Sequence, residues 1–344
     1  MNACANAVSL THTPAFLFAG AGSGMRDNAG MDTTTLTRFI KNIGRGKHAG
    51  DLSREDAQAL FAAMLSGNVA DLQLGGILIA LRVKGESLEE LAGFAAATEA
   101  SYAHLQPLST NAVPIVIPSY NGARQLPNLV PLLALLLARE GIPALVHGVT
   151  DDPGRVTTRE VFVSLGIAPA ISAGEARHQL ATVGVAFLPV DALAPEVAAL
   201  LALRRELGVR NSAHTLVKML QPFSGPAVRI VSVTHPEYLV RMREFFTAHD
   251  TAALLMRGAE GEAVAHPRRE PAMEWAFGGR VETWKDDSAV TAITEALPDR
   301  EARATAQWIE SVLAGKLPVP AAIAHQLACC RRAVAALTAP SVVS

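Results

Sequence analysis

The chain has 344 residues, half of them apolar, and a formal net charge of −2. A chain of this length buries a large core and predicts two subdomains or one large α/β unit. The small net charge excludes a protein that attracts nucleic acid through bulk basicity, so any anion-binding surface must be local. Arginine outnumbers lysine 24 to 6. This bias suits phosphate contacts because a guanidinium is planar and weakly hydrated, although a high-GC coding sequence would also produce it.

The cysteines and histidines indicate no metal site. Cys4, Cys329 and Cys330 have neither the spacing of metal ligands nor that of a disulfide framework. The ten histidines are scattered, without a His-x-x-x-His pair. We therefore expect no metal, no cofactor and a reducing cytoplasmic compartment.

Residues 1–31 differ from the rest of the chain. They lack periodicity, and their apolar stretch Ala15–Ala21 is too short to span a membrane. No basic segment precedes it, as one would in a signal peptide. We interpret residues 1–31 as a disordered tail, or as a segment upstream of a true start at Met31.

From Met31 to about Leu105 the apolar spacing is helical throughout. Ser53, followed by Asp56 three residues later, precedes a helical apolar pattern and is typical of a capped helix start. A second helix is expected over 72–82, and a third begins at the pair Ser87 and Glu90. Residues 32–106 are therefore predicted to form an all-α domain.

After Pro107 short apolar strands alternate with helices. Strands are expected at 115–117, 144–147, 185–188, 229–233 and 253–256, and helices at 128–139, 159–166, 173–181 and 236–248. This alternation is typical of βαβ units and a parallel sheet. The fold class predicted for 107–194 and 225–338 is an α/β domain with a mostly parallel central sheet flanked by helices. Two consecutive helices in 195–224 are expected to join the N-terminal helical domain.

The turn after the first predicted strand is unusual. Several glycines normally let the backbone N–H groups of such a turn approach a phosphate. Here Gly122 stands among Pro118, Tyr120, Asn121 and Arg124, and proline removes a donor. The sequence therefore predicts that the turn is no phosphate cradle. It is an ordinary surface turn, or one that contacts a larger ligand through Tyr120, Asn121 and Arg124, with Tyr120 free to stack on a base.

Two segments, Asp51–Phe94 and Leu203–Phe223, resemble in residue type and order the N-terminal and hinge-side helices of anthranilate phosphoribosyltransferases. The resemblance covers about residues 35–335. It implies a small helical domain, an α/β domain and a cleft between them, which in the enzymes holds phosphoribosyl pyrophosphate, Mg²⁺ and anthranilate. It also implies a homodimer formed through the N-terminal helical domains.

Three motifs of these enzymes are altered. Their Gly-Thr-Gly-Gly-Asp turn, which wraps the pyrophosphate, matches Ser119–Gly122. Their Lys-His-Gly-Asn-Arg run keeps His147 and Gly148 but has lost the lysine and its Asn-Arg end. Their adjacent Asp-Glu pair, which binds Mg²⁺, matches a stretch in which Glu260 and Glu262 are separated and arginines follow. Each lost element would stabilise the departing pyrophosphate by several kcal/mol, so the transfer reaction is not expected.

The chain instead resembles the branch of this family that binds DNA and RNA without sequence preference. The helix predicted at 195–208 carries Arg204 inside an apolar arc, and residues 210, 214 and 218 share one helix face because they are four apart. Locally only Glu196 and Glu206 oppose them. Arg82 and Arg155 are expected at the rim of the same cleft. The candidate nucleic-acid contacts are Arg204, Arg205, Arg210, His214, Lys218, Arg124, Arg268, Arg269 and Lys47.

Three functions stay open. The first is sequence-independent binding of DNA or RNA by a homodimer with access to the nucleoid. The second is a phosphoribosyl- or glycosyltransferase with an altered donor site, in which Asn121, Arg124, His147 and Glu262 hold a different phosphorylated sugar. The third is a catalytically inactive subunit that binds a protein partner. The missing lysine and Asp-Glu pair favour the first function. The basic helix face could also be an ordinary solvated surface that binds no nucleic acid.

Overall fold

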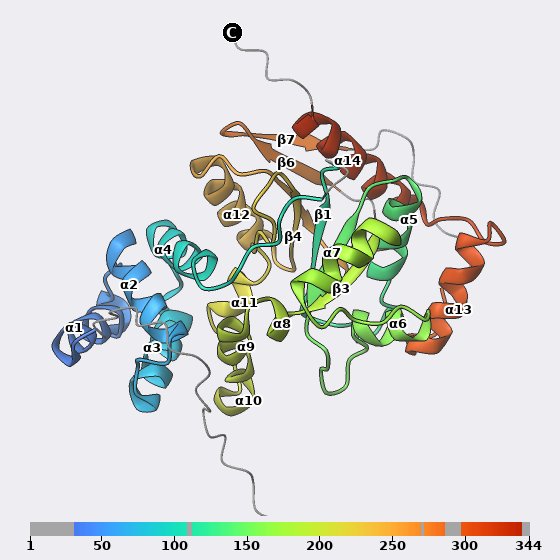
Figure 1. The fold of residues 1–344 in the computed structure, drawn as a ribbon. Helices are drawn as coiled ribbons and strands as arrows, with labels where there is room; N and C mark the ends of the chain where they lie inside the picture. The colour runs from blue at the N-terminus through green and yellow to red at the C-terminus, as the bar shows by residue number, and fades with distance from the viewer. Residues whose placement is uncertain (1–30, 109–111, 270–271, 286–296, 339–344) are drawn as a thin grey trace, which may run out of the picture. The chain divides into compact units, whose positions relative to one another are not determined.

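The computed structural model describes residues 31–108, 112–269, 272–285 and 297–338. Residues from Met31 onward belong to one compact unit (Figure 1). The tail predicted over 1–31 falls, apart from Met31, outside the described residues.

Four helices precede the first strand, and local sequence signals define where two of them begin. Ser53 accepts a hydrogen bond from the Asp56 N–H, and Ser87 and Glu90 form a reciprocal capping box, which confirms both predicted helix starts. Phe61 and Phe94 stack at 4.8 Å in the core of this helical segment. The elements are α1 (Thr33–Ile43), the 3₁₀ turn η1 (Gly46–His48), α2 (Arg54–Leu65), α3 (Asp71–Lys84) and α4 (Leu88–Glu99).

A seven-stranded sheet forms the centre of the remaining chain, in the order β3-β2-β1-β4-β5-β6-β7. Its first five strands in the sequence are parallel, as predicted. The last two form an antiparallel hairpin at one edge, which was not predicted although the Gly278-Gly279 pair at its turn is a typical hairpin signal. The strands are β1 (Ile115–Ser119), β2 (Ala144–Gly148), β3 (Val185–Pro189), β4 (Val228–Val233), β5 (Ala253–Arg257), β6 (Met273–Phe277) and β7 (Arg280–Trp284).

Helices cover both faces of the sheet (Figure 1), which confirms the predicted α/β class. One face packs against α5 (Val130–Arg139), α6 (Thr158–Ser164), α13 (Ala302–Leu313) and α14 (Ala321–Thr338). The other packs against α7 (Ala173–Thr182), α8 (Val190–Leu193) and α12 (Pro236–Ala248). No helix in the described ranges combines the length and the apolar character that crossing a membrane requires.

The segment 195–224 differs from the two helices predicted there. It contains α9 (Pro195–Ala202), α10 (Arg204–Leu207) and α11 (Ala213–Leu216), and it packs through α9 on α2 and through α11 on α4. The single helix predicted over 195–208 is divided into α9 and α10 at Leu203, although Leu203 keeps helical backbone angles, with φ −59° and ψ −16°. Gly208 then ends α10 in the left-handed conformation, at φ 71°.

Candidate functional site at the carboxyl end of the sheet

Five backbone N–H groups of the loop after β1 converge on two carboxylates from the segment after β5. Two of them donate to Oε1 of Glu262, at 2.7 and 2.6 Å. Three donate to the carboxylate of Glu260, at 2.9, 3.0 and 3.2 Å. The donors, in the same order, belong to Asn121, Gly122, Arg124, Gln125 and Leu126. We call these donors and the two carboxylates the amide cradle.

The expectation that a turn with a single glycine cannot cluster its backbone N–H groups is wrong, whereas the prediction that it is no phosphate cradle stays a prediction. Gly122 has a φ of 66°, and this one left-handed residue is enough to turn successive N–H groups toward a common side. Pro118 and Pro127 flank the run of donors and remove none of them. The loop therefore binds an anion, and that anion is the carboxylate pair of the chain itself.

The carboxylates reach the loop because the backbone of their own segment is sharply turned. Glu260 has a φ of 52° and Gly261 a φ of 88°. A left-handed conformation costs a non-glycine residue about 1–2 kcal/mol, and at Glu260 the hydrogen bonds to the loop offset this cost. A Cβ at position 261 would lie 1.8 Å from Nδ2 of Asn121, so only glycine fits there.

Burial raises the pKa of the Glu262 carboxyl group, while hydrogen bonds from Ser119, Asn121 and Gly122 and the charge of Lys218 lower it. Lys218 is half-buried and lines the neighbouring cavity. Its Nζ donates to the carbonyl oxygens of Ser232 and Gly261 at 3.2 and 3.4 Å. Burial, followed by the charge of Arg210, lowers the pKa of Lys218 to about 8. Lys218 is thus held by backbone carbonyls and does not extend freely into solvent.

Several arginines gather beside the amide cradle. A cavity of about 200 Å³ is lined there by Arg82, Arg210, His214, Lys218, His235 and Tyr238, among others. Arg210 donates to Oδ1 of Asn121 at 2.6 Å, and Arg155 donates to the Asn121 carbonyl at 3.1 Å.

These arginines lie close enough to act on one another. Burial and the charges of Arg204, Arg155 and Arg82 lower the pKa of Arg210. We call Arg82, Arg155, Arg204 and Arg210 the cation cluster. Like charges held together in this way favour binding of an anion.

His214 belongs to the same cavity but is uncharged at neutral pH. Burial, together with the charges of Arg210 and Arg204, lowers its pKa to about 4. Its Nδ1 lies 3.2 Å from Oδ1 of Asn211. The expectation that His214 adds a positive charge is therefore wrong, and its ring offers a hydrogen bond instead.

Arg204 and Arg205 each form an ion pair with an aspartate that was not predicted from the sequence. Arg204 pairs with Asp152 at 3.4 Å, and Arg205 pairs with Asp151 at 2.8 Å. The side chains of Arg205 and Asp151 are 68% and 73% exposed, so their pair is weak and easily exchanged for another anion. The aspartates follow β2, about fifty residues earlier in the chain, which is why only Glu196 and Glu206 were expected to oppose these arginines.

The other predicted cations lie apart from the cation cluster. Arg269 lines a second hollow of about 480 Å³ together with Gln125 and Glu260 of the amide cradle. Arg124 and Arg268 are exposed, and neither lines one of the two hollows. Lys47 is exposed on η1 and lines neither hollow. The structure thus brings together Arg204, Arg210, His214 and Lys218 of the predicted set.

Other residues of the loop after β1 form contacts within the protein. Tyr120 is only 6% exposed, and its hydroxyl lies 2.6 Å from Nδ1 of His147. The expectation that Tyr120 is free to stack on a base is therefore wrong, because its ring is buried with that histidine. Ser119 Oγ bonds to Thr158 Oγ1 at 2.7 Å. A Cβ at Gly148 would lie 1.8 Å from the Ser119 carbonyl oxygen, so the ends of β1 and β2 are in close contact.

Two buried polar atoms of this region have no hydrogen-bond partner among the residues that the structure describes. They are Nε2 of His147 and Oε2 of Glu262. Burial lowers the pKa of His147 to about 3, so its ring is neutral at physiological pH. Within the described ranges, no three His, Cys, Asp or Glu side chains are grouped to hold a metal ion.

The helical segment and the mostly parallel sheet with helices on both faces together have the fold of the anthranilate phosphoribosyltransferases. Residues 37–101 match the sequence model of the glycosyl transferase family helical bundle domain. Over 87% of both chains, the fold matches that of anthranilate phosphoribosyltransferase from Thermus thermophilus, with a TM-score of 0.69 at 20% identity. The yeast enzyme, solved in complex with PRPP and Mg, gives a TM-score of 0.69 at 16% identity and covers 89% of this chain and 90% of its own.

Sequence relatives show the family. The protein of Escherichia coli strain K12 named Uncharacterized protein YbiB is 48% identical over 85% of this chain and 92% of its own length. Anthranilate phosphoribosyltransferase of Desulfosudis oleivorans is 30% identical over 69% of this chain and 65% of its own length. The chain therefore belongs to the family of YbiB, and it shares the fold of the anthranilate phosphoribosyltransferases.

Proposed function

We propose that this chain binds DNA or RNA without sequence preference, through the cation cluster, on a scaffold that no longer transfers phosphoribosyl groups. One observation carries the proposal: the chain's own carboxylates occupy the amide cradle, whereas arginines are concentrated beside it. A small pyrophosphate would have to displace two carboxylates that together accept hydrogen bonds from five N–H groups. A polymer needs only the arginines beside the cradle, because its affinity comes from many phosphate contacts.

The positions of the arginines support contact with a polyanion. Arg204 is 38% and Arg205 68% exposed. A phosphate backbone can replace Asp151 in the exposed pair with Arg205, whereas Asp152 is 12% exposed and lies near both Arg204 and Arg155. The guanidinium of Arg210 donates a hydrogen bond to Asn121 Oδ1, so it is oriented before any ligand binds. The proposed binding takes place in the cytoplasm, with access to the nucleoid.

We further propose that the functional unit is a homodimer formed through the helical segment. Leu72, Ile79 and Val83 of α3 are 90%, 40% and 77% exposed. Their spacing of seven and four residues places them on one side of the helix. Gly76 lies on the same stripe, and a Cβ there would meet nothing within 4 Å. A second copy of the chain, packing α3 against α3, would cover this apolar stripe.

The second candidate function is a transferase with an altered donor site. The cavity of about 200 Å³ has room for a small phosphorylated molecule, which Arg210 and His214 would contact. Glu262, assigned to the donor in that reading, is instead buried and bonded to the loop. This observation favours the binding function.

Two assays on the same preparation separate the candidates. The first measures the anisotropy of a labelled oligonucleotide, and the second measures consumption of anthranilate with phosphoribosyl pyrophosphate and Mg²⁺. We expect binding without turnover, with Arg210→Ala weakening the binding. Arg303→Ala is the matched control. It also removes one positive charge, but Arg303 is an exposed residue of α13 and does not belong to the cation cluster. Turnover of anthranilate, or equal binding by both variants, would contradict the proposal.

A further inference from the structure

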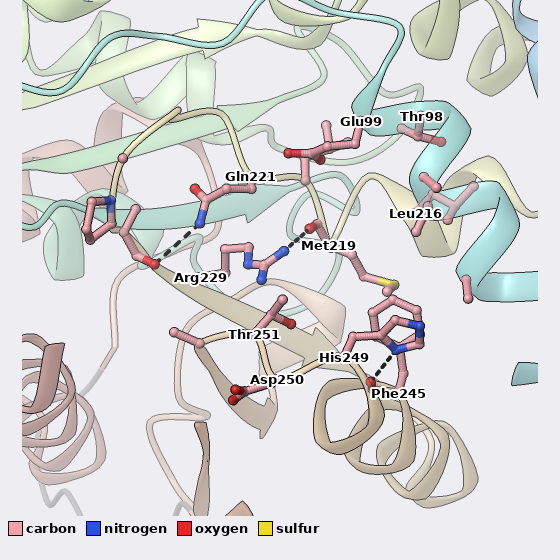
Figure 2. A pocket seen from close by; sticks show the side chains of 18 of the residues that line it. Thr98, Glu99, Leu216, Met219, Gln221, Arg229, Phe245, His249, Asp250 and Thr251 are labelled. Carbon is pink, nitrogen blue, oxygen red and sulfur yellow. Dashed lines mark hydrogen bonds between the residues drawn. The ribbon is translucent and has the colours of Figure 1, made fainter. Parts of the chain in front are cut away.

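A cavity of about 470 Å³ lies at the amino end of β4, whereas the cation cluster lies near the carboxyl end of that strand. Figure 2 shows its wall, which is formed by residues of α4, the segment around α11, β4 and α12. The lining is largely apolar. It includes Leu216, Met219, Leu220, Phe245 and Leu337. None of the predicted nucleic-acid contacts lines this cavity, so it is a separate site.

One cation, Arg229, is buried in this apolar wall. It is only 9% exposed, and its guanidinium carbon lies 5.2 Å from the centre of the Phe246 ring. Nη1 donates to the Met219 carbonyl at 3.0 Å, as Figure 2 shows. Nε has no partner in the described part of the chain. A guanidinium withdrawn from water needs more than one neutral carbonyl, because burying an incompletely paired charge costs several kcal/mol.

The nearest acidic group does not neutralise Arg229 by contact. Glu99 also lines the cavity, but its two carboxylate oxygens bond to the Tyr102 hydroxyl at 2.8 Å and to His104 Nε2 at 2.7 Å. Among the described residues, no carboxylate forms an ion pair with Arg229. The guanidinium thus lacks a direct counter-ion.

Two further buried polar atoms of the same wall lack partners in the described ranges. They are Oε1 of Gln221 and Oγ1 of Thr251. Buried polar atoms are nearly always hydrogen-bonded, and exceptions call for a specific explanation. With Nε of Arg229, three such atoms belong to residues of one cavity wall, which favours binding of a polar group of a ligand there.

We propose that this cavity binds a small organic molecule that has an apolar body and a single carboxylate, with the carboxylate paired to Arg229. A carboxylate matches the fork of one guanidinium, and the apolar side chains accommodate the body. A phosphate dianion fits less well. Glu99 and Asp250, which also line the cavity, repel a second negative charge, and the second arginine of the lining, Arg54, is exposed.

The test uses the full chain with 4-phenylbutyrate and its neutral amide, 4-phenylbutyramide, followed by saturation-transfer NMR and calorimetry. We expect the acid to bind at least about tenfold more tightly than the amide, as one charge-assisted pair provides. In Arg229→Met this preference disappears, while oligonucleotide binding is retained. Arg204→Ala supplies the converse control, with weaker oligonucleotide binding and an unchanged acid preference.

A second variant keeps the proposal testable if Arg229→Met does not fold. Ala96 lines the cavity from α4, so Ala96→Phe fills the space and leaves Arg229 in place. We expect it to abolish binding of both probes. Equal affinity for acid and amide, an acid preference that survives in Arg229→Met, or no binding of the acid at millimolar concentration would overturn the proposal.

Discussion

Oε1 of Glu262 accepts a hydrogen bond from the N–H of Gly122 at 2.6 Å, although the two residues are 140 positions apart in the chain. The same oxygen accepts from Asn121, and Glu260 accepts from the next three donors of the loop. A turn of this kind usually offers its N–H groups to a ligand. In this chain the N–H groups of the turn instead bind two carboxylates of a distant segment and so join the two segments.

Glu262→Gln should destabilise the fold by about 1–3 kcal/mol, because the N–H groups of Asn121 and Gly122 then lose a charged acceptor. Urea unfolding followed by circular dichroism measures this change. The control is Glu244→Gln on α12, which removes an exposed carboxylate and should change the free energy of unfolding by no more than about 0.5 kcal/mol. If both variants were as stable as the native chain, the amide cradle would have no structural role.

His147 makes stability depend on pH. Its pKa is lowered to about 3 by burial, from 6.5 in the unfolded chain. Between these values the unfolded state binds a proton that the folded state does not, so stability falls as the pH drops from 6.5 toward 3. Between about pH 7 and about pH 5, His147→Gln should remove about 2 kcal/mol of this acid sensitivity. Unfolding measured at about pH 7 and about pH 5 tests this, and parallel losses in both proteins would be the contrary result.

Tyr120→Phe removes only the hydroxyl that bonds to His147. We expect a loss of about 1 kcal/mol in the free energy of unfolding and no change in oligonucleotide affinity. The anisotropy titration should superimpose on that of the native chain. If Tyr120→Phe clearly weakened oligonucleotide binding, Tyr120 would have to contact the ligand after all.

The double change of Leu72→Glu and Val83→Glu tests the proposed dimer. It places charges on the exposed stripe of α3, and size-exclusion chromatography with light scattering should then report a monomer where the native chain is a dimer. Val163→Glu is the matched control, because Val163 is 49% exposed on a different helix, α6. A native chain that is monomeric at micromolar concentration would disprove the dimer.

Features that depend on neighbours in the sequence could be predicted. The capped starts at Ser53 and Ser87 and the parallel strands follow from local hydrogen bonding and apolar periodicity. Contacts between distant segments could not be predicted in this way. The pairing of Gly122 with Glu262, and that of Arg204 with Asp152, exist only after the sheet has brought loops from different strands to one end.

The inward position of Tyr120 was missed for a related reason. An aromatic residue in a Pro- and Gly-containing turn resembles an exposed one until its partner is known, and His147 comes from the neighbouring strand β2. The charge of His214 was also misjudged. Its neutral state results from burial and from the arginines that surround it, neither of which its own sequence neighbours define.

The most direct test of the central claim is the salt dependence of oligonucleotide affinity. For the native chain, log affinity should fall linearly with log salt, with a slope of about −0.7 to −0.9 for each phosphate neutralised. In the Arg204→Ala/Arg210→Ala variant the slope should flatten by about 1.5, while Arg303→Ala leaves it unchanged. Affinity independent of salt, or an identical slope in the double variant, would contradict nucleic-acid binding by the cation cluster.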